Sequence, residues 1–254
     1  MALSLVAAVL TTCLVGIAPD GSADANRGAA NGTPASEPAT PPAAEASSQR
    51  VGGDLETQPQ RKGDNWVCGD MVVEAPLPEG YPAPTPAGAI EIKHYPSVRR
   101  AEFRGSGNSD RGRNGGFWPL FQHIKSRDIA MTSPVEMDYP GWSVNGQGPA
   151  AGGAEGRSGP WVMSFLYRSP DLGPTGDDGN VRVVDTEPVT VLAIGMRGPY
   201  GEAQVSRGIE QLQAWLADHP EWEVAGDPRA FYYNGPYVAN RNKWSEAHLP
   251  IRQR

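Results

Sequence analysis

The hydrophobic pattern divides the chain into an apolar leader, a long stretch without large apolar residues, and a region of alternating strand and helix patterns. The leader covers residues 2–18, which are predominantly apolar. Every Phe, Trp and Tyr lies at or after Trp66, so the earlier residues offer no aromatic group for a core. We therefore predict one folded domain over residues 65–254, which is long enough to bury a core of its own.

Within this domain, the same succession of patterns occurs twice. Each copy has a strand pattern interrupted by a proline, at Pro96 or Pro188, then an Arg-Gly pair, a helical pattern and two further strand patterns. The two prolines are 92 residues apart, as are Phe117 and Ile209 on the apolar faces of the two helices. Apolar residues spaced i, i+3, i+4, i+7 from Phe117 are typical of an amphipathic helix. The sequence therefore predicts a duplicated β-α-β-β unit.

Each unit alone would leave one sheet face and one helix stripe uncovered, so we expect the two units to pack together. The predicted fold class is α+β, with a twisted antiparallel sheet or distorted β-barrel and two flanking helices. A cleft between the halves is a usual place for a small-molecule pocket. The strands that follow the helices are expected at 129–137, 161–167, 230–238 and 243–251.

Stretches rich in Gly and Pro separate or precede these elements. Residues 105–116 and 141–160 are predicted to be irregular loops because of their glycine content. The Pro-rich segment 75–88 carries two residues able to dock, Leu77 and Tyr81. We expect this segment to wrap around the edge of the domain.

The leader and the residues after it predict export. Residues 2–18 are followed by Ser22-Ala23-Asp24-Ala25, which is typical of a signal peptide spanning residues 1–25. Residues 10–13 weakly resemble the site at which lipoproteins are lipidated, so a lipid anchor stays open as an alternative. Residues 26–64 are rich in Ala, Pro, Gly, Ser and Thr and are predicted to be a disordered linker. We expect a periplasmic or extracellular mature protein with no transmembrane segment.

Charge and cysteine content restrict the partners. The formal net charge is -7, and the chain has no Lys/Arg-rich run that would follow a phosphate backbone, which argues against nucleic acid. Cys13 and Cys68 are the two cysteines, and cleavage of the leader would leave Cys68 alone, without an intramolecular disulfide. The chain contains no CxxCH sequence, so covalent c-type haem attachment is excluded. We expect a monomer.

The common catalytic motifs are missing. The sequence contains no G-x-S-x-G elbow, no phosphate-binding G-x-x-x-x-G-K-(S/T) loop and no H-E-x-x-H pair, which favours a protein without catalysis. Glu102, Glu136 and Glu246 lie on strand-like segments and are expected at solvent-facing positions. A carboxylate turned into the cleft could instead act as a base or attract a cationic ligand.

One string resembles a known family. IAMTSPVEM at residues 129–137 resembles the IAMT-(A/S)-PV motif of the SOUL haem-binding proteins and directly follows the helical pattern GGFWPLFQHIKS. Other segments resemble that family in the same order: IEIKHYPSVRRAEF, WVMSFLY, VTVLAIGMRG, AFYYNGPYV and NRNKW. The resemblance extends from about Ile90 to Ile251. It implies a distorted β-barrel with two helices, shared with effector-binding domains similar to gyrase-inhibitor proteins, and reversible tetrapyrrole binding.

The resemblance also implies how haem would be held. In such proteins an apolar surface beside the first helix contacts the porphyrin, and basic groups bind its propionates. Arginines in the loop before that helix would add directional hydrogen bonds to the anion-attracting helix N-terminus. The candidate residues are Phe117, Phe121, Met131 and Met137 for the apolar surface, and Arg111 and Arg113 for the propionates.

Histidines are the candidates for an iron ligand. His94, His123 and His248 are considered, although a structural histidine held by hydrogen bonds is the ordinary outcome for each. His123 lies at the margin of the helix's apolar stripe, and His94 alternates with Ile90 and Ile92. No pair of histidines has metal-ligand spacing, so a zinc site is not supported.

Two other functions stay open. The same fold could bind another amphipathic or cationic small molecule, and a buried glutamate in the cleft with few basic groups near it would favour that function. The chain could also be a hydrolase that uses a cleft Glu and Tyr, or a redox enzyme that uses bound haem.

Overall fold

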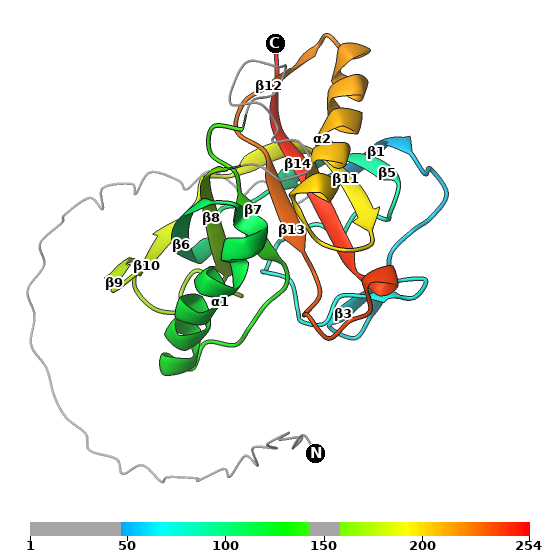
Figure 1. Ribbon diagram of the computed structural model, residues 1–254. Helices are drawn as coiled ribbons and strands as arrows, with labels where there is room; N and C mark the ends of the chain where they lie inside the picture. Colours follow the sequence, from blue (N-terminus) through cyan, green and yellow to red (C-terminus); the bar gives the residue numbers. More distant parts are fainter. Residues whose placement is uncertain (1–46, 143–157) are drawn as a thin grey trace, which may run out of the picture. The chain divides into compact units, whose positions relative to one another are not determined.

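The computed structural model describes residues 47–142 and 158–254 (Figure 1). The predicted signal peptide, residues 26–46 of the predicted linker and most of the predicted 141–160 loop lie outside the described residues.

Eleven strands of the described residues form one large sheet, and three more form a small one. In the large sheet the order is β1-β5-β11-β14-β13-β7-β8-β6-β10-β9, with β12 beside β14, and the strands pair antiparallel. Their bounds are β1 Ser47–Gly53, β5 Ala89–Tyr95, β6 Arg99–Gly107, β7 Val135–Asp138, β8 Gly159–Leu166, β9 Gly176–Asp178, β10 Val181–Asp185, β11 Val189–Arg197, β12 Trp222–Val224, β13 Arg229–Tyr232 and β14 Trp244–Gln253. The small sheet contains β2 Gln60–Lys62, β3 Asn65–Cys68 and β4 Met71–Val72, and the helices are α1 Ser109–Ser126, α2 Glu202–Ala217 and the short η1 Asn240–Asn242.

The strand order is symmetric about its centre. Outward from the β13–β7 pair, β14 corresponds to β8, β11 to β6, β5 to β10 and β1 to β9. Two interlocked β-α-β-β units would produce this order, although the sequence duplication itself stays a prediction. The path of pairing ends at β1 and at β9 within the described residues, so the predicted twisted sheet is observed rather than a closed barrel. The predicted α+β fold class, with one large antiparallel sheet and two helices, is confirmed.

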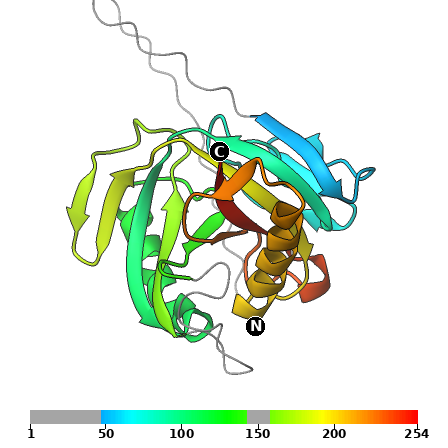
Figure 2. The same cartoon turned by 90° about the horizontal axis from the view of Figure 1, so that it is seen from above.

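Both helices pack on the same side of the sheet, which curves around them (Figure 2). They share one apolar core with the strands, because residues such as Leu120 of α1 and Leu212 of α2 are fully buried in it. The opposite side of the sheet, here called the rear face, has a second apolar cluster that includes Phe231 and Trp244. The central strands are therefore buried on both faces.

The glycine-rich stretch 105–116 is regular, contrary to the prediction. Strand β6 continues to Gly107 and helix α1 begins at Ser109. A Cβ atom on Gly105 or Gly112 would lie 2.1 or 2.5 Å from the ring of Trp161, which is too close for any other residue. These glycines are required for close packing against an indole, so their presence did not signal an irregular loop.

The predicted linker includes ordered structure at its end. Residues 47–53 form β1, which pairs with β5, and the Arg50 guanidinium binds Glu91 at 3.0 Å. Strand β2, the first strand of the small sheet, also precedes residue 65. The folded region therefore begins before the predicted boundary at residue 65. An edge strand is held mainly by backbone hydrogen bonds, which is why a stretch without aromatic residues could still be ordered.

The Pro-rich segment crosses the rear face rather than the edge of the domain. Residues 73–88 are here called the cover segment. Its Leu77 is buried, Tyr81 contacts Tyr95 edge to face with ring centroids 4.9 Å apart, and Ala87 bridges to Gly195 of β11. A Cβ atom on Gly195 would lie 2.1 Å from the Pro86 carbonyl oxygen. A glycine at this position of β11 is what allows the cover segment to approach the sheet.

Candidate functional site

Helix α1 carries three adjacent aromatic residues, here called the aromatic surface: Phe117, Trp118 and Phe121. The rings of Phe117 and Phe121 stack with centroids 5.9 Å apart. Trp118 is perpendicular to both rings and is 59% exposed. Phe117 is anchored by an edge-to-face contact with Phe165 of β8. The surface therefore has a fixed base and one large exposed ring.

Helical periodicity explains this arrangement. Leu120 and Ile124 point into the core and are buried, while Phe117 and Phe121 lie at the margin of that stripe and are half-buried. Trp118 follows Phe117 by one position, which rotates it by about 100° out of the stripe. Trp118 is not among the residues predicted for the site. A large apolar residue outside the apolar stripe of a helix was the signal that could have found it.

The two methionines proposed beside this surface differ in exposure. Met131 is half-buried and packs against the main core. Met137 of β7 has no exposed surface, so it cannot form an exposed wall for a ligand as predicted. Strand alternation turns Met137 toward the helices, where the core surrounds it.

The two candidate arginines lie in the first turns of α1 and not in a preceding loop. Arg111 is exposed. Arg113 approaches Asp110 at 3.6 Å, and its guanidinium lies 5.8 Å from the centre of the Tyr232 ring. Of the two, Arg111 is the more accessible to an anion.

The N-terminus of α1 is occupied by protein carboxylates. The Glu202 carboxylate of α2 accepts hydrogen bonds from the Ser109 backbone N–H at 3.0 Å and its hydroxyl at 2.6 Å. In return, the Asp110 carboxylate of α1 accepts from the Glu202 backbone N–H at 3.2 Å. Each helix thus supplies an acidic group to the positive end of the other. The predicted propionate site at this helix end is already filled by Glu202.

His123 is buried beneath the other flank of α1. Its Nδ1 lies 2.6 Å from Asp178 Oδ2 and its Nε2 lies 2.7 Å from the Tyr167 hydroxyl. Arg127 contacts the same Asp178 oxygen at 2.8 Å. Both ring nitrogens of His123 therefore have partners, so neither is available to bind iron in this arrangement.

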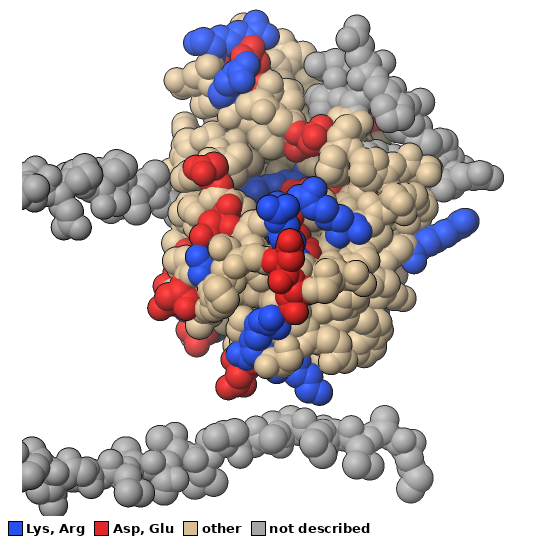
Figure 3. Space-filling view, turned by 90° about the vertical axis from the view of Figure 1, so that its left-hand side faces the viewer, with Lys and Arg blue, Asp and Glu red and all other residues tan. Residues whose placement is uncertain are grey.

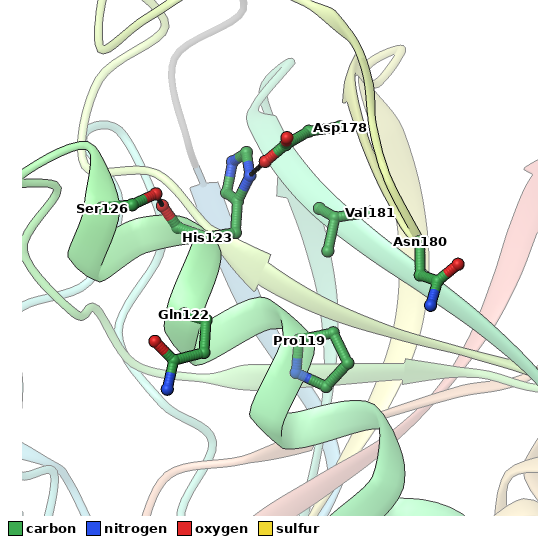
Figure 4. A pocket seen from close by; sticks show the side chains of 7 residues that line it. All are labelled: Pro119, Gln122, His123, Ser126, Asp178, Asn180 and Val181. Carbon is green, nitrogen blue, oxygen red and sulfur yellow. Dashed lines mark hydrogen bonds and ion pairs between the residues drawn. The ribbon is translucent and has the colours of Figure 1, made fainter.

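His123 is one of the residues that line a hollow between α1 and the β9–β10 hairpin (Figure 4). The hollow has a volume of about 310 Å³. The other residues that line it are Pro119, Gln122, Ser126, Asp178, Asn180 and Val181. This hollow and the aromatic surface lie on different flanks of one helix.

His248 and His94 are in different environments. His248 is fully buried on the rear face, where Arg229 Nε donates to its Nδ1 at 3.2 Å. Burial lowers the pKa of His248 to about 4, so the ring is neutral at pH 7 and donates from Nε2 to Glu246 at 2.8 Å. His94 is exposed at the end of β5, with Nδ1 2.8 Å from the Thr190 hydroxyl. Of the three candidate ligands, His94 alone is exposed.

The three glutamates expected to face solvent are buried on the rear face. Glu102 is 4% exposed, and Glu136 and Glu246 have no exposed surface. Strand pairing places them in one row, because Glu246 and Glu136 both face Phe231, and Ser164 lies between Glu136 and Glu102. Solvent does not reach this row because the cover segment and long arginine side chains lie over it.

Each buried glutamate has a basic partner. Glu246 binds Lys93 Nζ at 3.0 Å and accepts hydrogen bonds from Tyr233 and Thr85. Burial opposes ionisation of Glu246, but the Lys93 ammonium keeps its pKa below the usual value. Arg229 contacts Glu136 at 2.9 Å. The rear face is therefore an internally neutralised ion network.

Arg100 joins this network at its more open end. It contacts Glu136 at 3.1 Å, Asp138 at 3.0 Å and Glu102 at 2.7 Å. Burial and the neighbouring Glu136 carboxylate raise the pKa of Asp138 to about 7. Asp138 lies two residues along β7 from Glu136, beside this row, and its carboxyl group titrates near neutral pH.

No candidate metal centre is present among the residues that the structure describes. Within the same ranges, no helix is both long and apolar enough to span a membrane.

Figure 3 shows the side of the molecule that lies at the left in Figure 1. Acidic and basic side chains are interspersed on that side.

Sequence comparison identifies the family. The family model described as SOUL heme-binding protein matches residues 81–250. The chain belongs to the SOUL haem-binding protein family. The predicted resemblance is thereby confirmed. No curated protein matches the sequence.

Structural comparison agrees with the fold. The C-terminal domain of EcmrR is 13% identical, with a TM-score of 0.52, and the match covers 65% of this chain and 98% of that domain. EcmrR in a complex with DNA is 14% identical with a TM-score of 0.51, covering 65% of this chain and 57% of the longer EcmrR chain. A hydrolase from Listeria innocua is 14% identical with a TM-score of 0.47, covering 67% and 94%. At these identities the two EcmrR similarities show the fold alone.

Proposed function

We propose that this SOUL family protein binds haem or another tetrapyrrole reversibly on the aromatic surface of α1, without catalysis. The observation that carries the proposal is Trp118, a 59% exposed indole supported by two stacked phenylalanines. Contiguous apolar surface that is exposed to solvent often marks a binding site, and Trp118 adjoins the half-buried Phe117 and Phe121. A flat porphyrin offers a matching face for an aromatic ring to stack against.

Basic groups are available for the propionates on the same side of α1. Arg111 precedes Trp118 by seven residues and Lys125 follows it by seven. Seven residues are about two helical turns, so both side chains lie on the side of Trp118, each about 10 Å from it along the axis. Both residues are exposed. They could form charge-assisted hydrogen bonds to carboxylates.

Iron ligation contributes little to this proposed binding. His123 and His248 are buried with both nitrogens hydrogen-bonded, and His94 lies at the end of β5 rather than on α1. Contact with the porphyrin face is therefore the main source of affinity. Metal-free protoporphyrin IX should bind with an affinity similar to that of hemin.

Titration of the purified full-length protein with hemin tests the proposal. We expect a saturable Soret shift, and we expect Trp118→Ala to weaken binding roughly tenfold, because an indole contact of this kind is worth about 1–2 kcal/mol. Tyr237→Ala is the matched control, since Tyr237 is 80% exposed on a different segment. An absent Soret shift, or equal affinity for both variants, would contradict the proposal.

The rear face gives little support to the alternative of a cationic ligand. A buried glutamate with few basic neighbours would favour that function, but Glu246 is paired with Lys93 and Glu136 with two arginines. The cover segment also lies across Glu246 through hydrogen bonds from Thr85. We therefore retain tetrapyrrole binding as the proposed function.

We also propose that the protein acts outside the cytoplasm. The proposal rests on the apolar residues 2–18 and the Ala-Asp-Ala sequence that follows them. Cell fractionation combined with N-terminal sequencing of the mature protein tests it. A cytosolic protein that retains residues 1–25 would contradict it.

A further inference from the structure

The two helices face corresponding places in the sheet. His123 of α1 and Trp215 of α2 are 92 residues apart, and each side chain extends to an outermost strand. His123 reaches Asp178 of β9, whereas the Trp215 ring N–H donates to the Val51 carbonyl of β1 at 3.3 Å. Strands β9 and β1 are the two ends of the strand order. The space between helix and outer strand can therefore be compared directly between the two halves.

The side chains fill this space differently. At α2, the indole of Trp215 packs 3.4 Å from the position of a Cβ atom on Gly52 and stacks on His219 with ring centroids 3.6 Å apart. At α1, the smaller imidazole of His123 occupies the corresponding position. The hollow of about 310 Å³ remains beside it, which is at the lower end of the range for small-molecule pockets, about 300–1,000 Å³.

The walls of the hollow combine apolar and polar groups. Pro119 of α1 and Val181 of β10 lie on opposite sides of it (Figure 4). Gln122 and Asn180, which also line the hollow, carry side-chain amides. Asp178 binds His123 and Arg127 through Oδ2, while its Oδ1 has no partner within residues 47–142 and 158–254. One carboxylate oxygen is thus available to accept a hydrogen bond.

We propose that this hollow binds a small planar heteroaromatic molecule that carries an N–H group and is about the size of an indole. The ring lies between Pro119 and Val181, and its N–H donates to Asp178 Oδ1. The ligand is neutral, because Arg127 already balances the charge of Asp178. It takes the place that the Trp215 ring takes in the other half of the molecule.

Titration of the ¹⁵N-labelled full-length protein with indole, followed by NMR, tests this proposal. We expect saturable shifts at the side-chain amides of Gln122 and Asn180. 1-Methylindole has the same ring but no N–H group. It should bind about fivefold more weakly, which corresponds to the loss of one hydrogen bond.

Two variants place the indole ring of a tryptophan side chain in the hollow. Ser126→Trp and Gln122→Trp change exposed positions on its wall, and each should weaken indole binding at least tenfold. A dispersed NMR spectrum identifies the folded variant to be used. The proposal is overturned if indole shifts no lining residue, if a folded variant binds indole as the wild type does, or if 1-methylindole binds as tightly as indole. Loss of the indole shifts in Trp118→Ala would place indole on the aromatic surface and would also overturn it.

Discussion

The two helices of this protein pack on one sheet in corresponding positions but present different surfaces. At the positions of Trp118 and Phe121 in α1, α2 has Glu210 and Gln213, 92 residues later. The outer flank of α2 is closed by Trp215, whereas the corresponding flank of α1 leaves a hollow. The residues that support each helix from the core are similar in kind. The difference shows that one helix of two in corresponding positions can carry an exposed aromatic surface while the core beneath both is kept.

The largest expected effect on stability comes from removing an indole that supports α1, and it is compared with removal of an indole on α2. Trp161→Ala removes a buried indole that packs against Gly105, Gly112 and Gly116. We expect the free energy of unfolding to fall by about 3–5 kcal/mol, with loss of hemin binding because α1 is no longer fixed. Trp215→Ala, on the half-buried flank of α2, should cost about 1–2 kcal/mol and leave hemin binding intact. Chemical denaturation and Soret titration measure both. Equal effects on hemin binding would contradict the assignment of the site to α1.

A second prediction concerns the junction of the two halves, where Asp138 of β7 faces Arg229 of β13. The pKa of Asp138 is raised to about 7 in the folded protein, against about 3.9 in an unfolded chain. The folded state therefore favours the protonated carboxyl group. Its stabilising contribution is complete below about pH 4 and is lost as the pH rises to 7.

Asp138→Asn removes this titration. Between pH 4 and pH 7, the wild type should lose roughly 2–4 kcal/mol of stability relative to the variant, as measured by urea denaturation at several pH values. Asp185→Asn is the control, because the hydrogen bond from Arg99 lowers the pKa of Asp185, so that this carboxylate loses its stabilising contribution only below about pH 4 and not between pH 4 and pH 7. A difference between wild type and Asp138→Asn that does not change with pH would refute this account.

The smallest expected effect on stability comes from a double variant in which the surface of α1 is made to resemble that of α2. The double variant Trp118→Glu, Phe121→Gln gives α1 the residues found at the corresponding positions of α2. Hemin affinity should fall at least tenfold, which is about 1.4 kcal/mol. Stability should change by about 1 kcal/mol or less, because Trp118 is mostly exposed and Phe121 is half-buried. Unchanged hemin affinity would show that the aromatic surface is not the binding site.

The sequence predicted the helices, the strand order along the chain and the family. These features depend on local periodicity and on short motifs such as IAMTSPVEM. It did not predict the burial of Glu246, because the partner that stabilises this charge, Lys93, is 153 residues away and becomes adjacent only through strand register. The order in residues 105–116 was missed for the same reason, since Trp161 comes from a distant strand. Local patterns therefore predicted the scaffold better than the contacts across it.

The candidate site was predicted in part. Phe117 and Phe121 lie on α1 as expected, but Met137 is in the core and the anion-attracting end of α1 binds Glu202. The periodic pattern predicts core residues, and Trp118 lies outside that pattern, so the pattern does not indicate it. Residues that break an amphipathic pattern are thus as informative about function as those that form it.

The two ends of the sheet are the places at which strand pairing between molecules could begin aggregation, and each is protected in a different way. An unpaired edge strand can recruit a strand from another molecule and begin aggregation. At one end, β9 has only three residues and carries Asp177 and Asp178. At the other, β1 pairs along β5 and has an irregular register between Arg50 and Gly52. A protein shortened to the family-matched region from residue 81 would lack β1 and expose the apolar strand β5, so it should form intermolecular aggregates that the longer chain avoids.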